Sequence, residues 1–214
     1  MKVALWKNDH ENIQNIHISA RKKRGEVCVG KRIYIIRHCE AQGQLPESPL
    51  TEKGCAQAKD LSEFLSNTKI DRMISSPFLR AIQSVEPISK KRNIKIEIDE
   101  RLSERTLSTL DLPDWLEKLK ATFNELDLKF EGGESSREAM NRVINVVNEV
   151  FNSAYENVII VTHGNLMALL LKHYNPNLGF DCWENLSNPD VFVLSMTNAK
   201  VNLERLWQGH LLKE

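Results

Sequence analysis

The sequence predicts a three-layer α/β/α sandwich with a mostly parallel central sheet and an antiparallel strand at one edge. Strand and helix patterns alternate from residue 31 onward, which is typical of a sheet with helices on both faces. Residues 158–161 form a wholly apolar run, as expected for a central parallel strand buried on both sides. The last two apolar segments are separated only by a short turn, which indicates an antiparallel pair.

The first half of the chain supplies three strands and two helices. Residues 32–36 are a short β-branched run, and residues 51–66 form a helix with Thr51 as its N-cap and one apolar stripe that includes Cys55. Ser76 and Pro77 predict the next helix start, with serine as the N-cap and proline in the first helical position. The strands around this helix are expected at residues 70–75 and 94–98.

The second half supplies the rest of the sandwich. Ser135 and Glu138 form a capping box before the strongest helical stripe of the chain. Further helices and strands are expected at residues 113–126 (helix), 158–161 (strand), 166–171 (helix), and 191–196 and 201–207 (strands joined by the turn Asn198-Ala199-Lys200). No internal repeat interrupts this order. We therefore expect one catalytic domain over residues 31–214, preceded by an N-terminal extension over residues 1–30.

Composition narrows the class of protein. The chain has 214 residues, with 29 basic and 29 acidic side chains and a formal net charge of zero. Nucleic-acid binding is not expected, because it needs a basic surplus; the basic cluster at residues 21–24 is interpreted as a solvated tail. No run has the length of a signal peptide or a membrane span, so we expect a cytoplasmic protein that does not bind membranes. The four cysteines form no C-x-x-C pair, and no metal or cofactor is expected.

Two histidines occur where predicted strands end. Arg37 and His38 follow the first strand, and His163 and Gly164 follow the apolar strand 125 residues later. The carboxyl ends of strands in an open α/β sheet are where ligands bind. Arg80 falls in the first turn of the helix after the second strand. Two arginines, two histidines and helix starts on one edge suit a phosphoryl dianion.

Five short motifs follow in order between residues 32 and 197. They are Arg37-His38-x-Glu40, Pro49-Leu50-Thr51-x-x-Gly54-x-x-Gln57-Ala58, Ser75-Ser76-Pro77-x-x-Arg80-Ala81-x-Gln83-Ser84, Gly132-Gly133-Glu134-Ser135 and Thr162-His163-Gly164. Together they resemble the histidine phosphatase superfamily, also called phosphoglycerate mutase-like. Each motif alone is weak, but five in register are specific.

The resemblance implies a phosphohistidine mechanism. His38 attacks phosphorus while a backbone carbonyl holds its other ring nitrogen, so that the attacking nitrogen stays unprotonated. Arg37, Arg80 and His163 bind the phosphoryl oxygens, together with the backbone of Gly164. Gln44 occupies the place of an asparagine that often contacts the phosphate in this family. The proton donor is expected at Glu104, with Glu100 as the alternative.

Cys39 departs from the pattern, because the family normally has glycine there. A side chain at this position is expected to crowd the pocket. Nearby cations are expected to lower the pKa of the thiol, which would make it sensitive to oxidation.

The function indicated is a metal-independent phosphomonoester hydrolase that acts on a small phosphorylated metabolite. Two alternatives stay open: a cofactor-dependent phosphoglycerate mutase, and a non-catalytic phosphate-binding regulatory module. The short stretch between Glu104 and Gly132 favours the hydrolase, because such mutases carry a longer insertion. Lys118, Lys120 and Arg105 are candidates to bind a second anionic group. A homodimer through the last two strands is a further open alternative.

Overall fold

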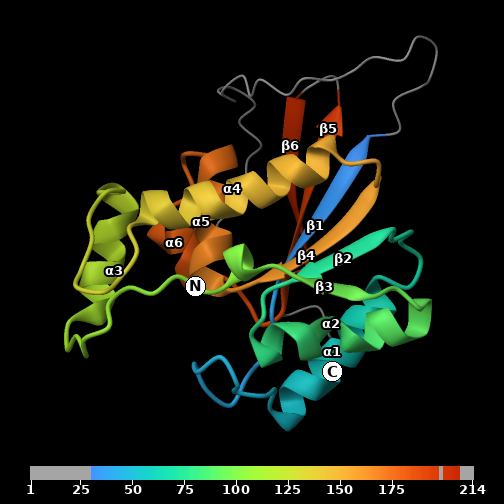
Figure 1. Cartoon of the computed structure of the whole chain (residues 1–214), viewed down its shortest axis with the longest axis horizontal. Coiled ribbons are helices and arrows are strands. Elements are labelled where there is room, and N and C mark those ends of the chain that lie inside the picture. Colours follow the sequence, from blue (N-terminus) through green and yellow to red (C-terminus); the bar gives the residue numbers. More distant parts are fainter. Residues whose placement is uncertain (1–29, 198–199, 208–214) are drawn as a thin grey trace, which may run out of the picture.

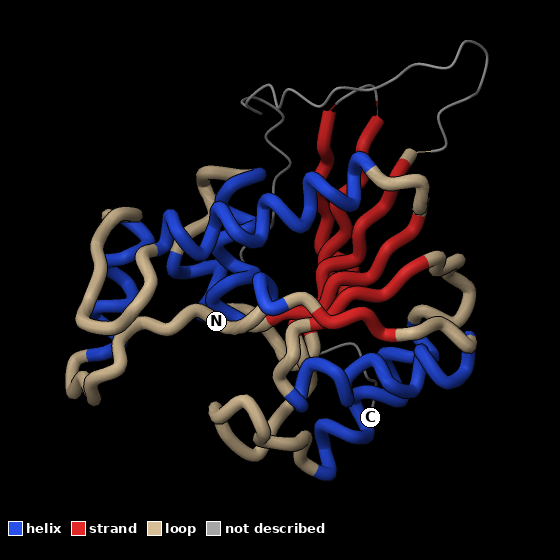
Figure 2. The backbone as a smooth tube through the Cα atoms, viewed as in Figure 1, coloured by secondary structure: helices blue, strands red, loops and turns tan. Residues whose placement is uncertain are grey.

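The protein is a six-stranded mixed sheet covered by helices on both faces (Figures 1 and 2). This computed structural model describes residues 30–197 and 200–207. The predictions for residues 1–29, for the turn residues Asn198 and Ala199 and for residues 208–214 of the predicted domain therefore lie outside the described residues. The order of the strands in the sheet is β3-β2-β4-β1-β5-β6. Their bounds are β1 Lys31–Arg37, β2 Arg72–Ser75, β3 Ile96–Ile98, β4 Asn157–Thr162, β5 Asp190–Thr197 and β6 Lys200–Trp207.

The first four strands are mutually parallel, and the last two are antiparallel at one edge. β1 pairs with β4 in parallel register, β2 pairs in parallel with both β4 and β3, β5 runs antiparallel to β1, and β6 runs antiparallel to β5. The predicted fold class is thus confirmed. The two late strands that were expected as an antiparallel pair are β5 and β6 at this edge.

Helices form the two outer layers. Figure 1 shows α1 (Glu52–Phe64) and α2 (Leu79–Arg92) on one face of the sheet, and the remaining helices on the other. That second group comprises α3 Trp115–Asn124, α4 Ser136–Asn152, α5 Gly164–Tyr174 and α6 Phe180–Glu184, with a short 3-10 helix, η1, at Glu100–Leu102. The sequence patterns did not predict α6 or η1, which are five and three residues long.

Side-chain alternation along β1 creates two separate cores. Ile33 and Ile35 belong to the core under α3 to α6, whereas Tyr34 and Ile36 belong to the core under α1 and α2. Successive side chains of a strand point to opposite faces of the sheet. All four are buried, so this strand is apolar throughout and alternates only in which layer it contacts.

The helix starts are mostly as predicted. The Thr51 side chain accepts a hydrogen bond from the Gly54 N–H at the start of α1, and Ser135 forms the expected capping box with Glu138 at α4. Burial along α1 differs from the prediction at one position, because Cys55 is exposed.

The prediction that Ser76 is the N-cap of α2 is wrong. This helix begins at Leu79, and its N-cap residue, Phe78, makes no side-chain capping bond. The Ser76 hydroxyl instead lies 2.7 Å from Nε2 of His163 and accepts a weaker bond from the Phe78 N–H. A tertiary contact has therefore replaced the local cap.

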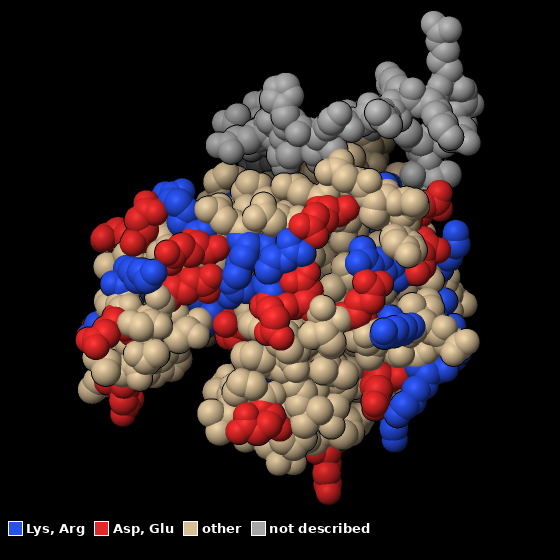
Figure 3. All heavy atoms as spheres, in the orientation of Figure 1, with Lys and Arg blue, Asp and Glu red and all other residues tan. Residues whose placement is uncertain are grey.

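The surface carries mixed charges and one clear hollow. On the face seen in Figure 3, basic and acidic side chains are interspersed, in keeping with the zero net charge. The same view shows a notch between the lobe that contains α3 and the layer of α1 and α2, and the carboxyl ends of the parallel strands lie toward this notch in Figure 1. Within residues 30–197 and 200–207, no helix has both the length and the hydropathy needed to span a membrane.

Candidate active site

The parallel register of β1 and β4 brings the two histidines together. Arg37 lies opposite Thr162 in this register, so the residues that follow them, His38 and His163, emerge side by side. Their ring centroids are 5.1 Å apart. Arg80, in the first turn of α2, completes the cluster, with its Nε atom 3.2 Å from Nε2 of His38. The predicted meeting of these side chains at the sheet edge is thus observed.

The contacts of His38 define one neutral tautomer of its ring. Nδ1 lies 2.7 Å from the carbonyl oxygen of Cys39, which can only accept a hydrogen bond, so Nδ1 carries the proton. Nε2 accepts from the Arg80 guanidinium and keeps its lone pair on the side of the cations. Burial lowers the pKa of His38 to about 3; the positive charges of Arg80 and Arg37 act in the same direction, against the hydrogen bond to Cys39. The ring is therefore uncharged at neutral pH, and its Nε2 atom carries no proton.

His163 is wholly buried. Its Nε2 atom contacts the Ser76 hydroxyl, and Nδ1 is a buried nitrogen with no hydrogen-bond partner among the described residues. Burial, followed by the neighbouring His38 and the charge of Arg80, holds the pKa of His163 well below its usual range. The ring of Phe78 packs edge-on against it, with centroids 4.7 Å apart. The sequence interpretation did not assign a site role to Ser76 or Phe78.

Both arginines are held by backbone carbonyls rather than by carboxylates. Arg37 donates from one terminal nitrogen to the Leu186 carbonyl at 2.8 Å, while its Nε is buried without a partner among the described residues. Arg80 donates to the carbonyls of Leu45 at 2.8 Å and Gln44 at 3.1 Å. Burial lowers the pKa of both guanidinium groups, and the charge of Glu104 opposes this. Carbonyl anchoring leaves their positive charge available to an anion.

Gly164 gives the Arg37 guanidinium room. A Cβ atom at this position would lie 3.2 Å from the central carbon of the guanidinium group. Gly164 is also the first residue of α5, whose N-cap is His163. The start of this helix therefore packs directly against one of the two arginines.

Glu104 joins the site from the loop after η1. Its carboxylate accepts hydrogen bonds from three backbone N–H groups: Arg105 at 2.9 Å, Asn165 at 3.1 Å and Leu166 at 3.1 Å. The last two are at the amino end of α5, where a helix favours negative charge. Glu100, the alternative candidate, is exposed on η1. Of the two glutamates, only Glu104 acts electrostatically on Arg37 and Arg80.

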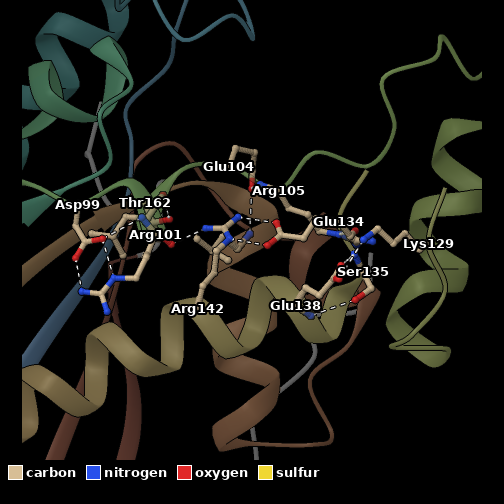
Figure 4. Close-up of polar contacts among 12 residues, drawn as sticks. Asp99, Arg101, Glu104, Arg105, Lys129, Glu134, Ser135, Glu138, Arg142 and Thr162 are labelled. Atoms are coloured by element: carbon tan, nitrogen blue, oxygen red, sulfur yellow. Dashed lines mark hydrogen bonds and ion pairs between the residues drawn. The ribbon is translucent and has the colours of Figure 1, made fainter. Parts of the chain in front are cut away.

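The Gly132–Glu134 segment fixes the loop that carries Glu104 (Figure 4). Glu134 forms a bidentate ion pair with Arg142 of α4, and Arg142 also donates to the Arg101 carbonyl. The backbone of Glu134 donates to Thr106 and accepts from the Arg105 side chain, both at 2.8 Å. The Glu104 loop is thus held on both sides of the carboxylate.

Two predicted site residues are not placed as expected. The prediction that cations lower the pKa of Cys39 is wrong, because burial raises the pKa of this thiol to about 12. Cys39 is fully buried in a small cluster with Leu50 and Ala58, so its side chain packs against α1. The Gln44 side chain is exposed, and the contact of this residue with Arg80 is made by its backbone carbonyl.

The described residues contain no group of three or more His, Cys, Asp or Glu side chains placed to hold a metal ion. The charged groups that converge are two guanidinium groups and one carboxylate, around two neutral imidazoles. This arrangement can bind a phosphoryl group, supply a nitrogen nucleophile and transfer a proton. It defines a phosphate-handling enzyme.

Comparison with known proteins identifies the class. A family profile described as the histidine phosphatase superfamily, branch 1, matches residues 33–208. The chain therefore belongs to this superfamily and is an enzyme of the phosphatase class.

Individual proteins of known name share between 22% and 31% of their aligned residues with this chain. Phosphoserine phosphatase 1 of Hydrogenobacter thermophilus is 26% identical over 148 residues, or 62% of this chain and 70% of the relative. Another protein of that bacterium is 31% identical over 157 residues, or 66% of this chain and 77% of the relative. The adenosylcobalamin/alpha-ribazole phosphatase of Salmonella typhimurium is 26% identical over 207 residues, or 83% and 98%. Among solved structures, a mycobacterial glucosyl-3-phosphoglycerate phosphatase superposes with a TM-score of 0.68 at 22% identity, covering 84% of this chain and 99% of the other.

Proposed function

We propose that this protein hydrolyses the phosphomonoester of a small metabolite through a phosphohistidine on His38, without a metal ion. The observation that carries the proposal is the tautomer of His38. Its Nδ1 proton is held by the Cys39 carbonyl, and its Nε2 lone pair lies beside the Arg80 guanidinium. A neutral imidazole fixed in this way is a nucleophile aimed at an anion-binding site.

The first step forms an N–P bond and breaks a P–O bond. The substrate binds as a monoanion and passes its proton to Glu104. Nε2 of His38 then attacks phosphorus, and the leaving oxygen takes this proton from Glu104 as the ester bond breaks. Arg37, Arg80 and His163 bind the remaining phosphoryl oxygens and stabilise their charge in the transition state. In this step Glu104 exchanges its contacts at the start of α5 for the leaving oxygen.

The second step returns the enzyme to its initial state. Water attacks the phosphohistidine, the N–P bond breaks, and Glu104 accepts the proton of the water. Inorganic phosphate then takes this proton from Glu104 and leaves as a monoanion, so that the His38 ring is neutral and Glu104 is ionised again. The same carboxylate thus acts as acid and then as base.

Hydrolysis is favoured over mutase activity by the surroundings of three cations. Lys118 is paired with Asp114, the Lys120 ammonium lies over the ring of Phe180, and Arg105 is buried with bonds to Glu134 and Thr122. None of these four contacts is with Arg37 or Arg80. The segment between Glu104 and Gly132 contains a single ten-residue helix, α3. A mutase has to hold a second phosphate, and these cations are engaged elsewhere.

The substrate class follows the named activities of the relatives. The matched phosphatases are named for phosphoserine, alpha-ribazole phosphate and glucosyl-3-phosphoglycerate. Proteins named as phosphoglycerate mutases also match, at 27% identity. We propose a small phosphomonoester as the substrate, and an assay with phosphoglycerate and a bisphosphoglycerate primer separates the mutase alternative.

The test is to trap the covalent intermediate. Wild type, His38→Ala and the matched control His173→Ala are mixed with a ³²P-labelled aryl phosphate and quenched rapidly. His173 is on α5 and contacts Tyr174 rather than the site. Acid-labile, base-stable label on wild type and His173→Ala, but not on His38→Ala, is the expected result. Turnover without label, or label that persists in His38→Ala, refutes the assignment.

A further inference from the structure

The carbonyl that orients the His38 ring belongs to a peptide group with a second anchor. The Cys39 carbonyl accepts from Nδ1 of His38 at 2.7 Å. The N–H of the same peptide group is that of Glu40, and it donates to Oε1 of Gln57 at 2.9 Å. Because a peptide group is planar and rigid, the Gln57 amide fixes the direction in which the Cys39 carbonyl points.

The start of α1 packs closely against the backbone of Glu40 and so holds Gln57 in place for its bond with the Glu40 N–H. The Thr51 N–H donates to the Glu40 carbonyl at 3.1 Å, and a Cβ atom on Gly54 would lie 2.0 Å from that carbonyl oxygen. Only glycine permits so close an approach. Gln57 is three residues further along α1, on the same face of the helix. The second sequence motif, from Pro49 to Ala58, thus seats a helix against the backbone that follows the nucleophile.

We propose that Gln57 is a positioning residue that keeps the His38 ring in its nucleophilic tautomer and orientation. Its amide oxygen holds the peptide plane. By accepting from the Glu40 N–H, it also polarises the Cys39 carbonyl at the other end of that group. The carbonyl then holds the Nδ1 proton more firmly, which leaves the Nε2 lone pair free for phosphorus. This proposal rests on the proposed function of His38.

Two other side chains anchor the preceding peptide group and serve as a contrast. The Ser84 hydroxyl accepts from the Cys39 N–H at 2.8 Å, and the Asn188 amide donates to the His38 carbonyl at 2.7 Å. These bonds hold the chain where β1 ends. Neither bond is made to the peptide group whose carbonyl contacts the imidazole, so of the three side chains that anchor this backbone, Gln57 has the most direct influence on the ring.

The experiment compares Gln57→Leu with two matched variants. Gln83→Leu removes an equivalent bond, because Oε1 of Gln83 accepts from the Leu50 N–H at 2.9 Å in the same loop. Gln57→Glu keeps an acceptor oxygen for the Glu40 N–H. The rate of phosphoenzyme formation is measured in a single turnover with an aryl phosphate, and inorganic phosphate binding is measured by competitive inhibition.

We expect Gln57→Leu to form the phosphoenzyme between about 10-fold and 100-fold more slowly, because small errors in the position of a reacting group have effects of this size. Phosphate binding should stay unchanged, since Arg37, Arg80 and His163 do not contact Gln57. Gln57→Glu should recover most of the rate. A loss in Gln57→Leu no greater than that in Gln83→Leu, or an equal loss of phosphate binding, overturns the proposal.

A second measurement separates this proposal from the nucleophile assignment. The ¹⁵N NMR signals of the histidine ring nitrogens report which nitrogen of His38 carries the proton, whether or not the protein turns over substrate. The proposal predicts a smaller fraction of the Nδ1-protonated form in Gln57→Leu than in wild type or Gln83→Leu. If no phosphoenzyme forms in wild type, the proposed function fails, while an unchanged tautomer in Gln57→Leu refutes the role of Gln57.

Discussion

Burial of the His38 ring makes the stability of the fold depend on pH. The ring is 8% exposed, and its pKa in the folded protein is about 3. In the unfolded chain a histidine titrates near 6.5. Between these values the unfolded chain binds a proton that the folded protein does not. The contribution of His38 to the free energy of unfolding is therefore fully present above about pH 6.5, and it is lost as the pH falls toward 3.

The size of the effect follows from the two pKa values. At about pH 4.5, protonation of this ring in the unfolded chain raises the ratio of unfolded to folded protein by roughly a hundredfold. This lowers the free energy of unfolding by about 2.7 kcal/mol. At about pH 7 the same contribution is only about 0.2 kcal/mol. We therefore expect His38 alone to destabilise the wild type by about 2.5 kcal/mol on going from pH 7 to pH 4.5.

The assay is urea denaturation of wild type and His38→Asn at both pH values. Asparagine removes the titrating group, and the pH-independent cost of its lost contacts cancels when each protein is compared with itself. The carboxylates are common to both proteins, so their contributions cancel as well. The contribution of His163 cancels to the extent that burial, the largest cause of its lowered pKa, is the same in both proteins. The stability difference between wild type and variant should shrink by about 2.5 kcal/mol at the lower pH. An unchanged difference means that the folded pKa of His38 is near its ordinary value and refutes the reasoning.

Three further outcomes are expected. Arg80→Lys removes the Nε donor to His38 and the fork that suits a phosphoryl group, so kcat/KM for an aryl phosphate should fall by about 100-fold to 1000-fold; a fall below about fivefold would contradict this role. Glu104→Gln should slow hydrolysis of an alkyl phosphate by about 100-fold or more, and that of a nitrophenyl ester much less, because nitrophenolate leaves without a proton; equal losses would exclude Glu104 as the proton donor. Cys39 is fully buried, with a pKa of about 12, so a thiol reagent should modify exposed Cys55 in the native protein and leave Cys39 intact; mass spectrometry that finds both labelled at similar rates would show that the packing is wrong.

The layered fold could be predicted because its strands and its longer helices carry local signals. The apolar run of β4, the capping box at Ser135 and the N-cap at Thr51 depend on neighbours in the sequence. The positions of the two histidines follow from the same logic, since each comes directly after a strand. The short elements η1 and α6 were not predicted, because three and five residues are too few for a hydrophobic period to show.

Contacts across the fold decided the features that the sequence did not predict. Ser76 has the residue type and the position of an N-cap, yet its hydroxyl is engaged by His163, which is 87 residues away. Cys39 directly follows Arg37 and His38 in the sequence, but its side chain is buried against Ala58 of α1. Both outcomes depend on which element packs against the strand end, and a single sequence does not contain that information.

The two faces of the sheet bury different numbers of apolar side chains, and this difference bears on how the enzyme loses activity. Among the described residues, the core under α3 to α6 contains 27 buried apolar side chains, whereas the core under α1 and α2 contains 13. Regions with fewer buried contacts open at lower free energy than the whole molecule does. The thinner layer carries Arg80 and Gln57, while Arg37 packs against Gly164 at the start of α5 in the thicker one. Mild heat or denaturant should therefore detach Arg80 from the phosphate site while the rest of the sheet stays folded. Amide hydrogens of α1 and α2 should exchange together with the loss of turnover, before those of α4 and α5.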